Sequence, residues 1–356
     1  MNGKTGIDCK SGAELCQGKT LINKFAPTKK EKAMHTGKII FFMTSILMLL
    51  VWNPVFSLAD GKGREPHRHA LVVGIGKYPA GSGWSKINGD RDITLVVRML
   101  VRNGFEKSDI IVLANSDATR KAIEKAFERL EESVSAGDIV YIHFSGHGQQ
   151  VTDIDGDEPD GLDEAFIPYD AGKVYSSGVY EGENHIIDDD LNDWLSELKA
   201  AVGQKGMVLV SMDACHSGDA TRGIDDDIVA GVRGTADVFV LPDHESEESE
   251  DRGSGSMSNS RTAKHTAGAS GTDAFENGGW ICISACKSYQ NNNEFKSSEG
   301  CFGRLTWALY KTLEPGMTLD ELVAELQEMY DTMPPPPGPP QNLDVAAPEN
   351  ISGPLF

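Results

Sequence analysis

The stretch GMVLVSMDACHSGDATRG, residues 206–223, begins as an apolar run and ends in glycines and polar residues. The run of Val, Leu and Met predicts a buried β-strand. Cys215 follows at its end, with Asp213 two residues before it and His216 directly after it. In open α/β sheets, ligands and reacting groups meet at the carboxyl ends of the strands. The sequence therefore predicts that Cys215 is presented for chemistry rather than packed into the core.

Other apolar runs of similar character alternate with amphipathic segments along the chain. The predicted strands are residues 69–78, 108–116, 137–148, 206–218 and 278–290. The predicted helices are residues 92–104, 116–134, 188–202, 300–313 and 318–333. This alternation predicts an α/β fold with a mostly parallel central sheet and helices on both faces. Residues 333–356 are Pro-rich and are predicted to form an extended tail.

The composition narrows the functional classes. The chain has 356 residues, is 39% hydrophobic and 24% charged, and carries a formal net charge of -21. This hydrophobic content is that of a globular protein. A strongly acidic chain lacks the clustered Lys and Arg that neutralise phosphates, so we expect no nucleic-acid partner. A cationic substrate or a divalent cation is the better match.

The first 59 residues differ from the rest of the chain. Lysines precede the apolar run of residues 39–52, and small residues then follow at Ser57 and Ala59. This order predicts a signal peptide over residues 34–59, translated from Met34 and cleaved near Ala59, and therefore an exported protein, periplasmic or secreted. The apolar run is shorter than the roughly 20 residues of a membrane-spanning helix. The alternative is that this segment is not cleaved and anchors the protein. It would then be the only part of the protein that contacts a membrane.

The exported part is predicted to consist of two structured segments and a linker. Residues 60–240 form the larger segment, residues 241–273 a flexible linker rich in Ser, Gly and acids, and residues 274–356 the smaller segment with the Pro-rich tail. Cys282 and Cys286 lie four residues apart in an apolar run, where an extended chain holds them too far apart for a disulfide. We expect them to be buried and reduced.

Two strand ends carry the candidate chemistry, HFSGHG at residues 143–148 and DACHSG at residues 213–218. If the sheet is parallel, both corners open on the same edge, so His147 and Cys215 can approach each other. A histidine within hydrogen-bond reach can take the proton of a cysteine and convert it to a nucleophilic thiolate. His216 is predicted to be a packing or loop residue without a catalytic role, because on an extended chain it points away from Cys215.

These motifs resemble those of the caspase and metacaspase superfamily of cysteine peptidases, and in particular its bacterial metacaspase-like branch. The resemblance runs from about His69 to the C-terminus and includes DEPDGLDEAFIPYD, IIDDDL, ISACKSYQNNNEF and GCFGRLTWAL. It implies the caspase-hemoglobinase-like fold and a cysteine endopeptidase. Cys215 would be the nucleophile and His147 the general base and acid of a dyad without a third residue. The N–H groups of Gly148 and Cys215 would form the oxyanion hole.

The resemblance also implies a substrate preference. Metacaspases use acidic residues to hold an Arg or Lys side chain of the substrate, and the matching positions are Asp92 and Asp213, with Ser284 lining the same pocket. Two carboxylates suit a guanidinium or an ammonium group. For Asp92, the alternative is a purely structural role as the N-cap of the helix that follows. We expect peptide or protein substrates with a basic residue before the cleaved bond, and a monomeric enzyme.

Regulation is the last implication of the resemblance. Calcium would be bound by Asp163, Asp188 and Asp189, with Asp219 or Asp225 as a further ligand, because hard carboxylate oxygens suit Ca²⁺. The alternative is that Asp188 or Asp189 caps the following helix. Self-cleavage in the exposed linker would occur after Arg261 or Lys264. A different class of function remains open, a catalytically idle, exported interaction module that uses its acidic surface and Pro-rich tail.

Overall fold

The apolar runs pair as the strands of one six-stranded sheet. The structure is a computed structural model that describes residues 64–156, 158, 161–215, 231–242, 279–336, 338–349 and 351–356. The order of the strands is β11-β8-β7-β3-β1-β2, in which only β11 is antiparallel to its neighbour. Their bounds are β1 Arg68–Gly74, β2 Ile110–Ala114, β3 Ile139–Ser145, β7 Met207–Asp213, β8 Ile281–Ser284 and β11 Asp344–Ala346. The predicted α/β fold with a mostly parallel sheet is confirmed.

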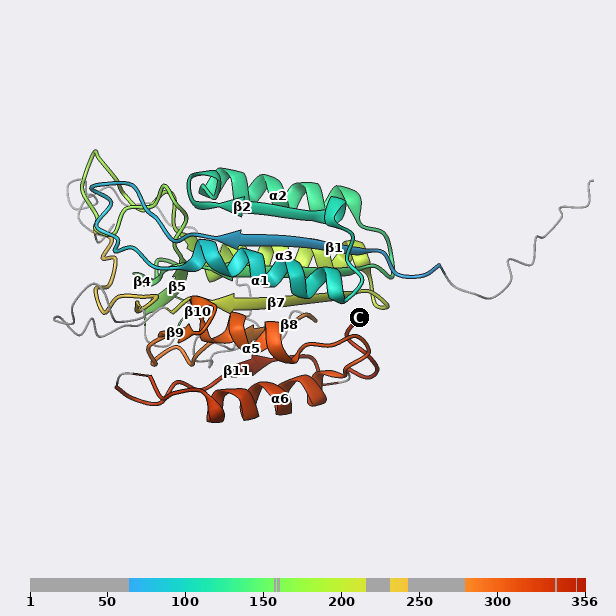
Figure 1. Cartoon of the computed structure of the whole chain (residues 1–356). Coiled ribbons are helices and arrows are strands. Elements are labelled where there is room, and N and C mark those ends of the chain that lie inside the picture. Colours follow the sequence, from blue (N-terminus) through green and yellow to red (C-terminus); the bar gives the residue numbers. More distant parts are fainter. Residues whose placement is uncertain are drawn as a thin grey trace, which may run out of the picture. The chain divides into compact units, whose positions relative to one another are not determined.

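Helices cover both faces of this sheet (Figure 1). One face packs against α1 (Gly89–Arg102), α5 (Arg304–Thr312) and α6 (Leu319–Thr332), and the other against α2 (Arg120–Ser133) and α3 (Asp188–Val202). Side chains of a strand alternate between the faces. Ala70 and Val72 of β1 therefore join the α1 side, and Leu71 and Val73 join the α2 side. Both sides of the sheet are buried, which explains why its strands are apolar throughout.

Three helix starts differ from the sequence prediction. Helix α1 begins at Gly89, so Asp92 is its fourth residue and not its N-cap. Helix α2 begins at Arg120, because Thr119 caps it and residues 115–117 form the short 3₁₀ helix η2 (Asn115–Asp117). Residues 300–303 form strand β10 (Gly300–Gly303), and α5 begins only at Arg304. In each case the amphipathic pattern predicted the helix but not its first turn.

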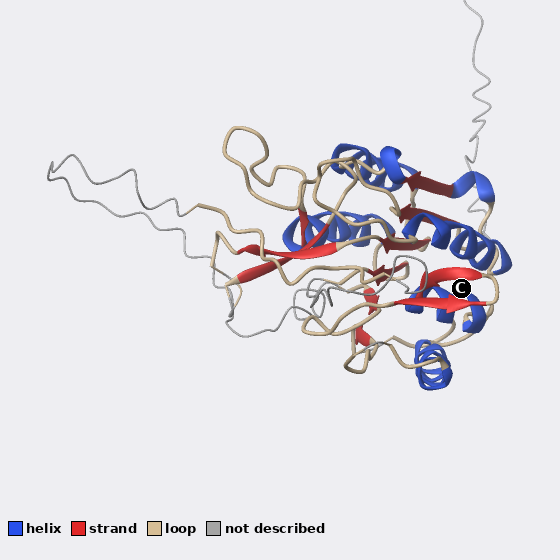
Figure 2. Cartoon of the chain, turned by 60° about the vertical axis from the view of Figure 1, so that its left-hand side comes forward, coloured by secondary structure: helices blue, strands red, loops and turns tan. Residues whose placement is uncertain are grey.

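The loops and two smaller sheets gather at the carboxyl ends of the parallel strands (Figure 1, Figure 2). One sheet contains β4 (Gly148–Thr152), β5 (Leu162–Phe166) and β6 (Ile186–Ile187), and the other pairs β9 (Glu294–Ser297) with β10. A second 3₁₀ helix, η1 (Lys107–Asp109), precedes β2. The described helices reach at most 15 residues, and none of them has the length and apolar character of a membrane span.

The C-terminal tail is part of the core. Strand β11 extends the sheet by pairing with β8, and Leu355 is buried among the residues that pack between the sheet and α5. The tail is therefore extended, as predicted, but its apolar residues are not free to bind a partner. The leader, residues 1–59, and nearly all of the predicted linker lie outside the described residues.

Candidate active site

His147 and Cys215 leave the sheet side by side. The last residues of β3 and β7, Ser145 and Asp213, are partners in the parallel pairing, and Gly146 N donates a hydrogen bond to the Asp213 carbonyl at 3.4 Å. His147 lies two residues after Ser145, and Cys215 lies two residues after Asp213. The two corners therefore meet at one edge of the sheet, as the sequence pattern predicts.

The ring of His147 is held by a loop between β1 and α1. Its Nε2 lies 2.9 Å from the Ser85 carbonyl oxygen, and its ring stacks on Trp84 with 4.9 Å between centroids. Because a carbonyl only accepts hydrogen bonds, the proton of a neutral ring belongs on Nε2. His147 Nδ1 is buried without a hydrogen-bond partner, and burial lowers the pKa of His147 to about 4. At neutral pH the ring is therefore uncharged, and Nδ1 carries a lone pair.

Cys215 presents its backbone and its side chain to different groups. Its N–H donates to the Arg233 carbonyl oxygen at 2.9 Å, and the N–H of Gly148 donates to the same oxygen at 3.4 Å. Its Sγ donates to the Gln290 carbonyl oxygen at 2.7 Å. The two N–H groups converge on one carbonyl oxygen, which is the arrangement that an oxyanion hole requires.

The Arg233 side chain fills a fully buried acidic pocket. Its Nη1 lies 2.7 Å from Asp92 Oδ2 and 3.3 Å from Asp213 Oδ1, and its Nη2 lies 3.1 Å from Glu294 Oε1. All four side chains are buried, and the relative exposure of Arg233 is 0%. The three carboxylates hold the pKa of Arg233 above its usual range despite burial. A buried cation with this many partners is stable only because each charge is compensated.

The two predicted pocket acids behave differently. Burial raises the pKa of Asp92 to about 6, an effect that Arg233 opposes and that the neighbouring Asp213 reinforces. Burial also acts on Asp213, but Arg233 and hydrogen bonds from Thr306 and Asn292 outweigh it and hold the pKa of Asp213 below its usual value. Asp213 is therefore the more firmly ionised of the two carboxylates.

The structure places a different serine at the pocket. Ser145 Oγ donates to Asp92 Oδ2 at 2.6 Å and accepts from Arg233 Nη1 at 2.7 Å. The predicted Ser284 instead has its Oγ 3.8 Å from Cys282 Sγ, on the α2 side of the sheet, whereas the pocket acids lie on the α1 side. The period of two along β8 decides this, and the assignment of Ser284 was wrong. The SGHG motif already contains Ser145, so a signal for it was present.

Comparison with known proteins shows what the region around this site is similar to. The family model "Metacaspase, peptidase C14 domain" matches residues 68–222. Metacaspase-1 of Pyricularia oryzae is 32% identical over 161 residues, which are 43% of this chain and 37% of the relative. Metacaspase-1B of Aspergillus oryzae is 33% identical over 161 residues, which are 43% of this chain and 35% of the relative. Over residues 68–222 the chain is thus similar to the peptidase domain of metacaspases.

The match covers the metacaspase domain and not the whole relatives. The chain spans little more than a third of the length of these two metacaspases. A crystal structure of a Geobacter sulfurreducens protein is similar with a TM-score of 0.50 and 22% identity, and covers 79% of this chain and 94% of that chain. That structure supports the fold of this chain and nothing about its chemistry.

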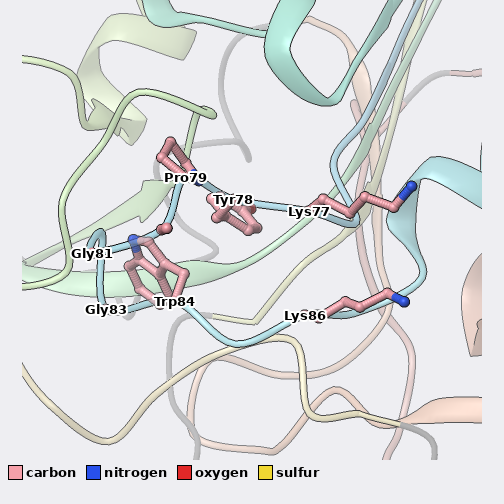
Figure 3. Close-up of a pocket in the computed structure, with 8 residues that line it drawn as sticks. Lys77, Tyr78, Pro79, Gly81, Gly83, Trp84 and Lys86 are labelled. Atoms are coloured by element: carbon pink, nitrogen blue, oxygen red, sulfur yellow. The ribbon is translucent and has the colours of Figure 1, made fainter.

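A surface pocket of about 600 Å³ lies on the loop that holds the histidine (Figure 3). Tyr78 and Trp84 line it, and both rings also contact His147, with centroid distances of 5.2 and 4.9 Å. Lys77 and Lys86 extend in a common direction away from the two rings (Figure 3). This pocket beside His147 is thus aromatic and basic, in contrast to the buried acidic pocket around Arg233.

The predicted calcium ligands gather around the start of α3. Asp188 begins the helix, and carboxylate oxygens of Glu158, Glu164 and Asp188 lie within 4.8 Å of one another. Burial and the negative charges of Glu164, Asp163 and Asp189 raise the pKa of Asp188 to about 8. Sequence reasoning missed Glu158 and Glu164.

The acid that caps α3 is neither Asp188 nor Asp189. The Ile187 N–H donates to Asp190 Oδ2 at 3.2 Å, so Asp190 has the capping role. Asp188 Oδ1 is buried without a hydrogen-bond partner. Several predicted residues lie outside the part of the chain that the structure describes: His216, Asp219, Asp225, Arg261 and Lys264. The four described cysteines are reduced, and Cys282 and Cys286 are buried, as predicted.

Proposed function

We propose that this chain is a cysteine endopeptidase that cleaves peptide bonds after Arg or Lys, with Cys215 as the nucleophile and His147 as the general base. One observation carries the proposal. The Arg233 carbonyl oxygen accepts from the N–H groups of Cys215 and Gly148, while its guanidinium is bound by Asp92 and Asp213. A substrate arginine before the cleaved bond would be bound by the same groups.

The chemistry follows from the groups present. His147 Nδ1 takes the Cys215 proton, and Sγ forms a bond to the carbonyl carbon of the substrate. The negative charge that develops on the carbonyl oxygen is stabilised by the N–H groups of Cys215 and Gly148. The carbon–nitrogen bond breaks, and His147 returns the proton to the leaving amine. Water, deprotonated by the same ring, then hydrolyses the thioester and regenerates the thiol.

The position of the Ser85 carbonyl supports this role of His147. A dyad needs the imidazole to present one nitrogen to the thiol, and the 2.9 Å contact from Nε2 to Ser85 O fixes which nitrogen that is. Trp84 stacks on the ring, and Tyr78 packs against it at a tilt. A backbone carbonyl would thus orient the ring in place of the third side chain of a triad.

We also propose a regulatory calcium ion near the start of α3, held by Asp188, Glu158 and Glu164 with Asp163 and Asp189 close by. Clustered carboxylate oxygens are the ligands that Ca²⁺ prefers, and the unpartnered Asp188 Oδ1 fits such a ligand. The ion would neutralise like charges beside β5, which pairs with β4 directly after His147. It would take no part in the bond cleavage.

Three further proposals rest on the sequence. The leader directs export and is removed near Ala59. The enzyme acts as a monomer on peptide or protein substrates. It cuts itself in the linker, after Arg261 or Lys264.

The test of the activity is hydrolysis of three matched peptides that end in Arg, Lys or Asp before a fluorescent leaving group. We expect hydrolysis after Arg and Lys but not after Asp, and loss of roughly a thousandfold or more in kcat/KM for Cys215→Ala. Cys282→Ala is the matched control, because Cys282 is also a buried, reduced thiol, its Sγ lies 3.8 Å from Ser284 Oγ, and the variant should retain activity. Cleavage after Asp alone would contradict the pocket assignment, and equal rates for Cys215→Ala would contradict the nucleophile.

The calcium site is tested in the same protein by two measurements. With calcium in place of a chelator, we expect faster hydrolysis and a higher melting temperature, because binding to the folded state alone stabilises it. Asp188→Asn should abolish both effects, whereas Asp193→Asn, on an exposed position of α3, should retain them. A melting temperature that is independent of calcium in the parent protein would refute the site.

A further inference from the structure

Residues 231–234 lie in the active site as a substrate chain would. Arg233 N donates to the Asn292 carbonyl at 2.9 Å, and Glu294 N donates to the Gly231 carbonyl at 2.8 Å. Between them, Val232 and Asn293 form an antiparallel bridge. The segment is thus an added strand on the edge formed by residues 292–294, which is a common way for proteins to bind an extended peptide.

The Arg233 side chain leaves no room for a second guanidinium. Gly303 forms one wall of the pocket, and a Cβ atom at Gly303 would lie 2.0 Å from Asp213 Oδ2 and 2.5 Å from Arg233 Nη1. All three carboxylates of the pocket are already bound to Arg233. A substrate Arg or Lys can enter only after Arg233 has left.

The backbone of Arg233 places a particular bond at the reacting position. Its carbonyl oxygen accepts from Cys215 N and Gly148 N, so its carbonyl carbon is the one that Cys215 would attack. The bond that would break is Arg233–Gly234. The Cys215 Sγ, however, donates to Gln290 O at 2.7 Å, so the thiol must first leave this carbonyl to reach the Arg233 carbon.

Downstream of Arg233, the chain is anchored to β4. Phe239 is buried, its N–H donates to Gln150 O at 2.8 Å, and its carbonyl accepts from Thr152 N at 3.0 Å. Gln149 Nε2 also donates to the Asp237 carbonyl at 2.9 Å. Cleavage of Arg233–Gly234 would separate Arg233 from this anchor, and the effective concentration of Arg233 at the pocket would fall.

We propose that residues 231–234 inhibit the enzyme in cis, with Arg233 closing the acidic pocket, and that Arg233–Gly234 is the bond whose self-cleavage relieves this inhibition. This rests on the proposed peptidase function and extends it to regulation. In the self-cleavage, Cys215 Sγ bonds to the Arg233 carbonyl carbon, the bond to Gly234 N breaks, and His147 transfers the thiol proton to that nitrogen. Water then hydrolyses the thioester and leaves Arg233 with a free carboxylate.

Two variants of the full chain are compared. One leaves the pocket empty, and the other keeps Arg233 in the pocket but makes the Arg233–Gly234 bond resistant to cleavage. Arg233→Ala removes the occupant. Gly234→Pro keeps Arg233 and its three carboxylates but replaces the bond to be cleaved with a tertiary amide that lacks the N–H. An occupant lowers the apparent affinity for substrate by the fraction of open molecules, so we expect kcat/KM for the Arg peptide to be about tenfold or more higher for Arg233→Ala than for Gly234→Pro.

Covalent labelling and mass measurement provide readouts that do not depend on turnover. An arginyl chloromethyl ketone should label Cys215 rapidly in Arg233→Ala and slowly in Gly234→Pro. Incubation of the parent protein should yield a fragment that begins at Gly234, and Cys215→Ala and Gly234→Pro should not. Arg261→Ala is the matched control and should still yield this fragment. Arg233→Lys keeps the buried cation, and it should yield the fragment even if Arg233→Ala does not fold.

The outcomes distinguish the two levels of the proposal. If Gly234→Pro hydrolyses and labels as fast as Arg233→Ala, or if the active parent protein is never cut at Gly234, cis inhibition is refuted and the peptidase proposal stands. If neither variant nor the parent protein hydrolyses an Arg peptide or reacts with the ketone, the peptidase proposal itself fails.

Discussion

The guanidinium pocket is an arrangement of individual charges. Asp92 and Asp213 contact Nη1 of Arg233, and Glu294 reaches the other terminal nitrogen, Nη2. A guanidinium presents several donors in a rigid plane, whereas an ammonium group is a compact point charge. Glu294 is therefore placed to read the second nitrogen of an arginine, which a lysine lacks.

Glu294→Gln should separate Arg from Lys substrates. We expect kcat/KM for the Arg peptide to fall by roughly tenfold or more, because the neutral amide accepts a weaker hydrogen bond from a guanidinium than the carboxylate does, and the Lys peptide to be affected less. The measurement is the ratio of the two kcat/KM values. Glu299→Gln is the control, since Glu299 pairs with Lys311 on the exposed side of the β9–β10 hairpin. Equal losses for both peptides would show that Glu294 does not discriminate between them.

At the scale of elements, the pocket depends on how closely α1 approaches the sheet. A Cβ atom at Gly89, the first residue of α1, would lie 2.5 Å from the Ile75 carbonyl oxygen and 2.7 Å from that of Ser145. Both of these atoms belong to the backbone, which cannot rotate away as a side chain can. Only glycine allows the helix to begin there, and this start brings Asp92 to the end of β3.

Gly89→Ala should therefore weaken both stability and activity. Overpacking of this kind costs about 1–3 kcal/mol, and the shift of α1 should raise KM for the Arg peptide by moving Asp92. Chemical denaturation and peptide kinetics check the two effects. Ser196→Ala, on an exposed position of α3, is the control and should change neither. A variant with parent stability and parent KM would contradict this account of the helix start.

At the scale of the whole molecule, the sheet joins the two predicted parts of the chain. Strand β8 and the antiparallel β11 come from the part after the linker, and β8 pairs directly with β7, which ends beside Cys215. Four histidines of the described residues are buried, and burial lowers the pKa of three of them, His143, His147 and His185, to about 4 each. The molecule is therefore expected to be sensitive to acid.

The direction of this pH dependence follows from the number of protons that the folded and the unfolded chain bind. Between pH 6.5 and 4 the unfolded chain binds protons on these histidines and the folded chain does not, so their contribution to stability is lost as the pH falls. His185→Gln should reduce the loss between pH 7 and 4 by up to about 3 kcal/mol. Urea unfolding across this range measures it, and Asp92, which contributes in the opposite direction, cancels in the difference. Identical pH profiles for parent and variant would contradict the buried neutral state of His185.

The sequence by itself determined the features that depend on local patterns. Runs of apolar residues predicted the parallel strands, helical spacing predicted the helices, and the two motifs predicted that His147 and Cys215 meet at one edge. Asp92 and Asp213 followed from the resemblance to a family. These inferences need only the period of each element and the rule that parallel strands end at a common edge.

Only the tertiary structure decided what closes the site. Glu294, Ser145 and the Ser85 carbonyl reach it from a hairpin, a neighbouring strand and a loop, and Arg233 fills it from a segment with no pattern of its own. Their positions depend on packing between segments up to about two hundred residues apart, as for Arg233 and Asp92 or Asn88 and Glu294. The physical reason is that the energy of a charge depends on the groups that lie near it in space. The periodicity of a single element does not determine which distant groups these are.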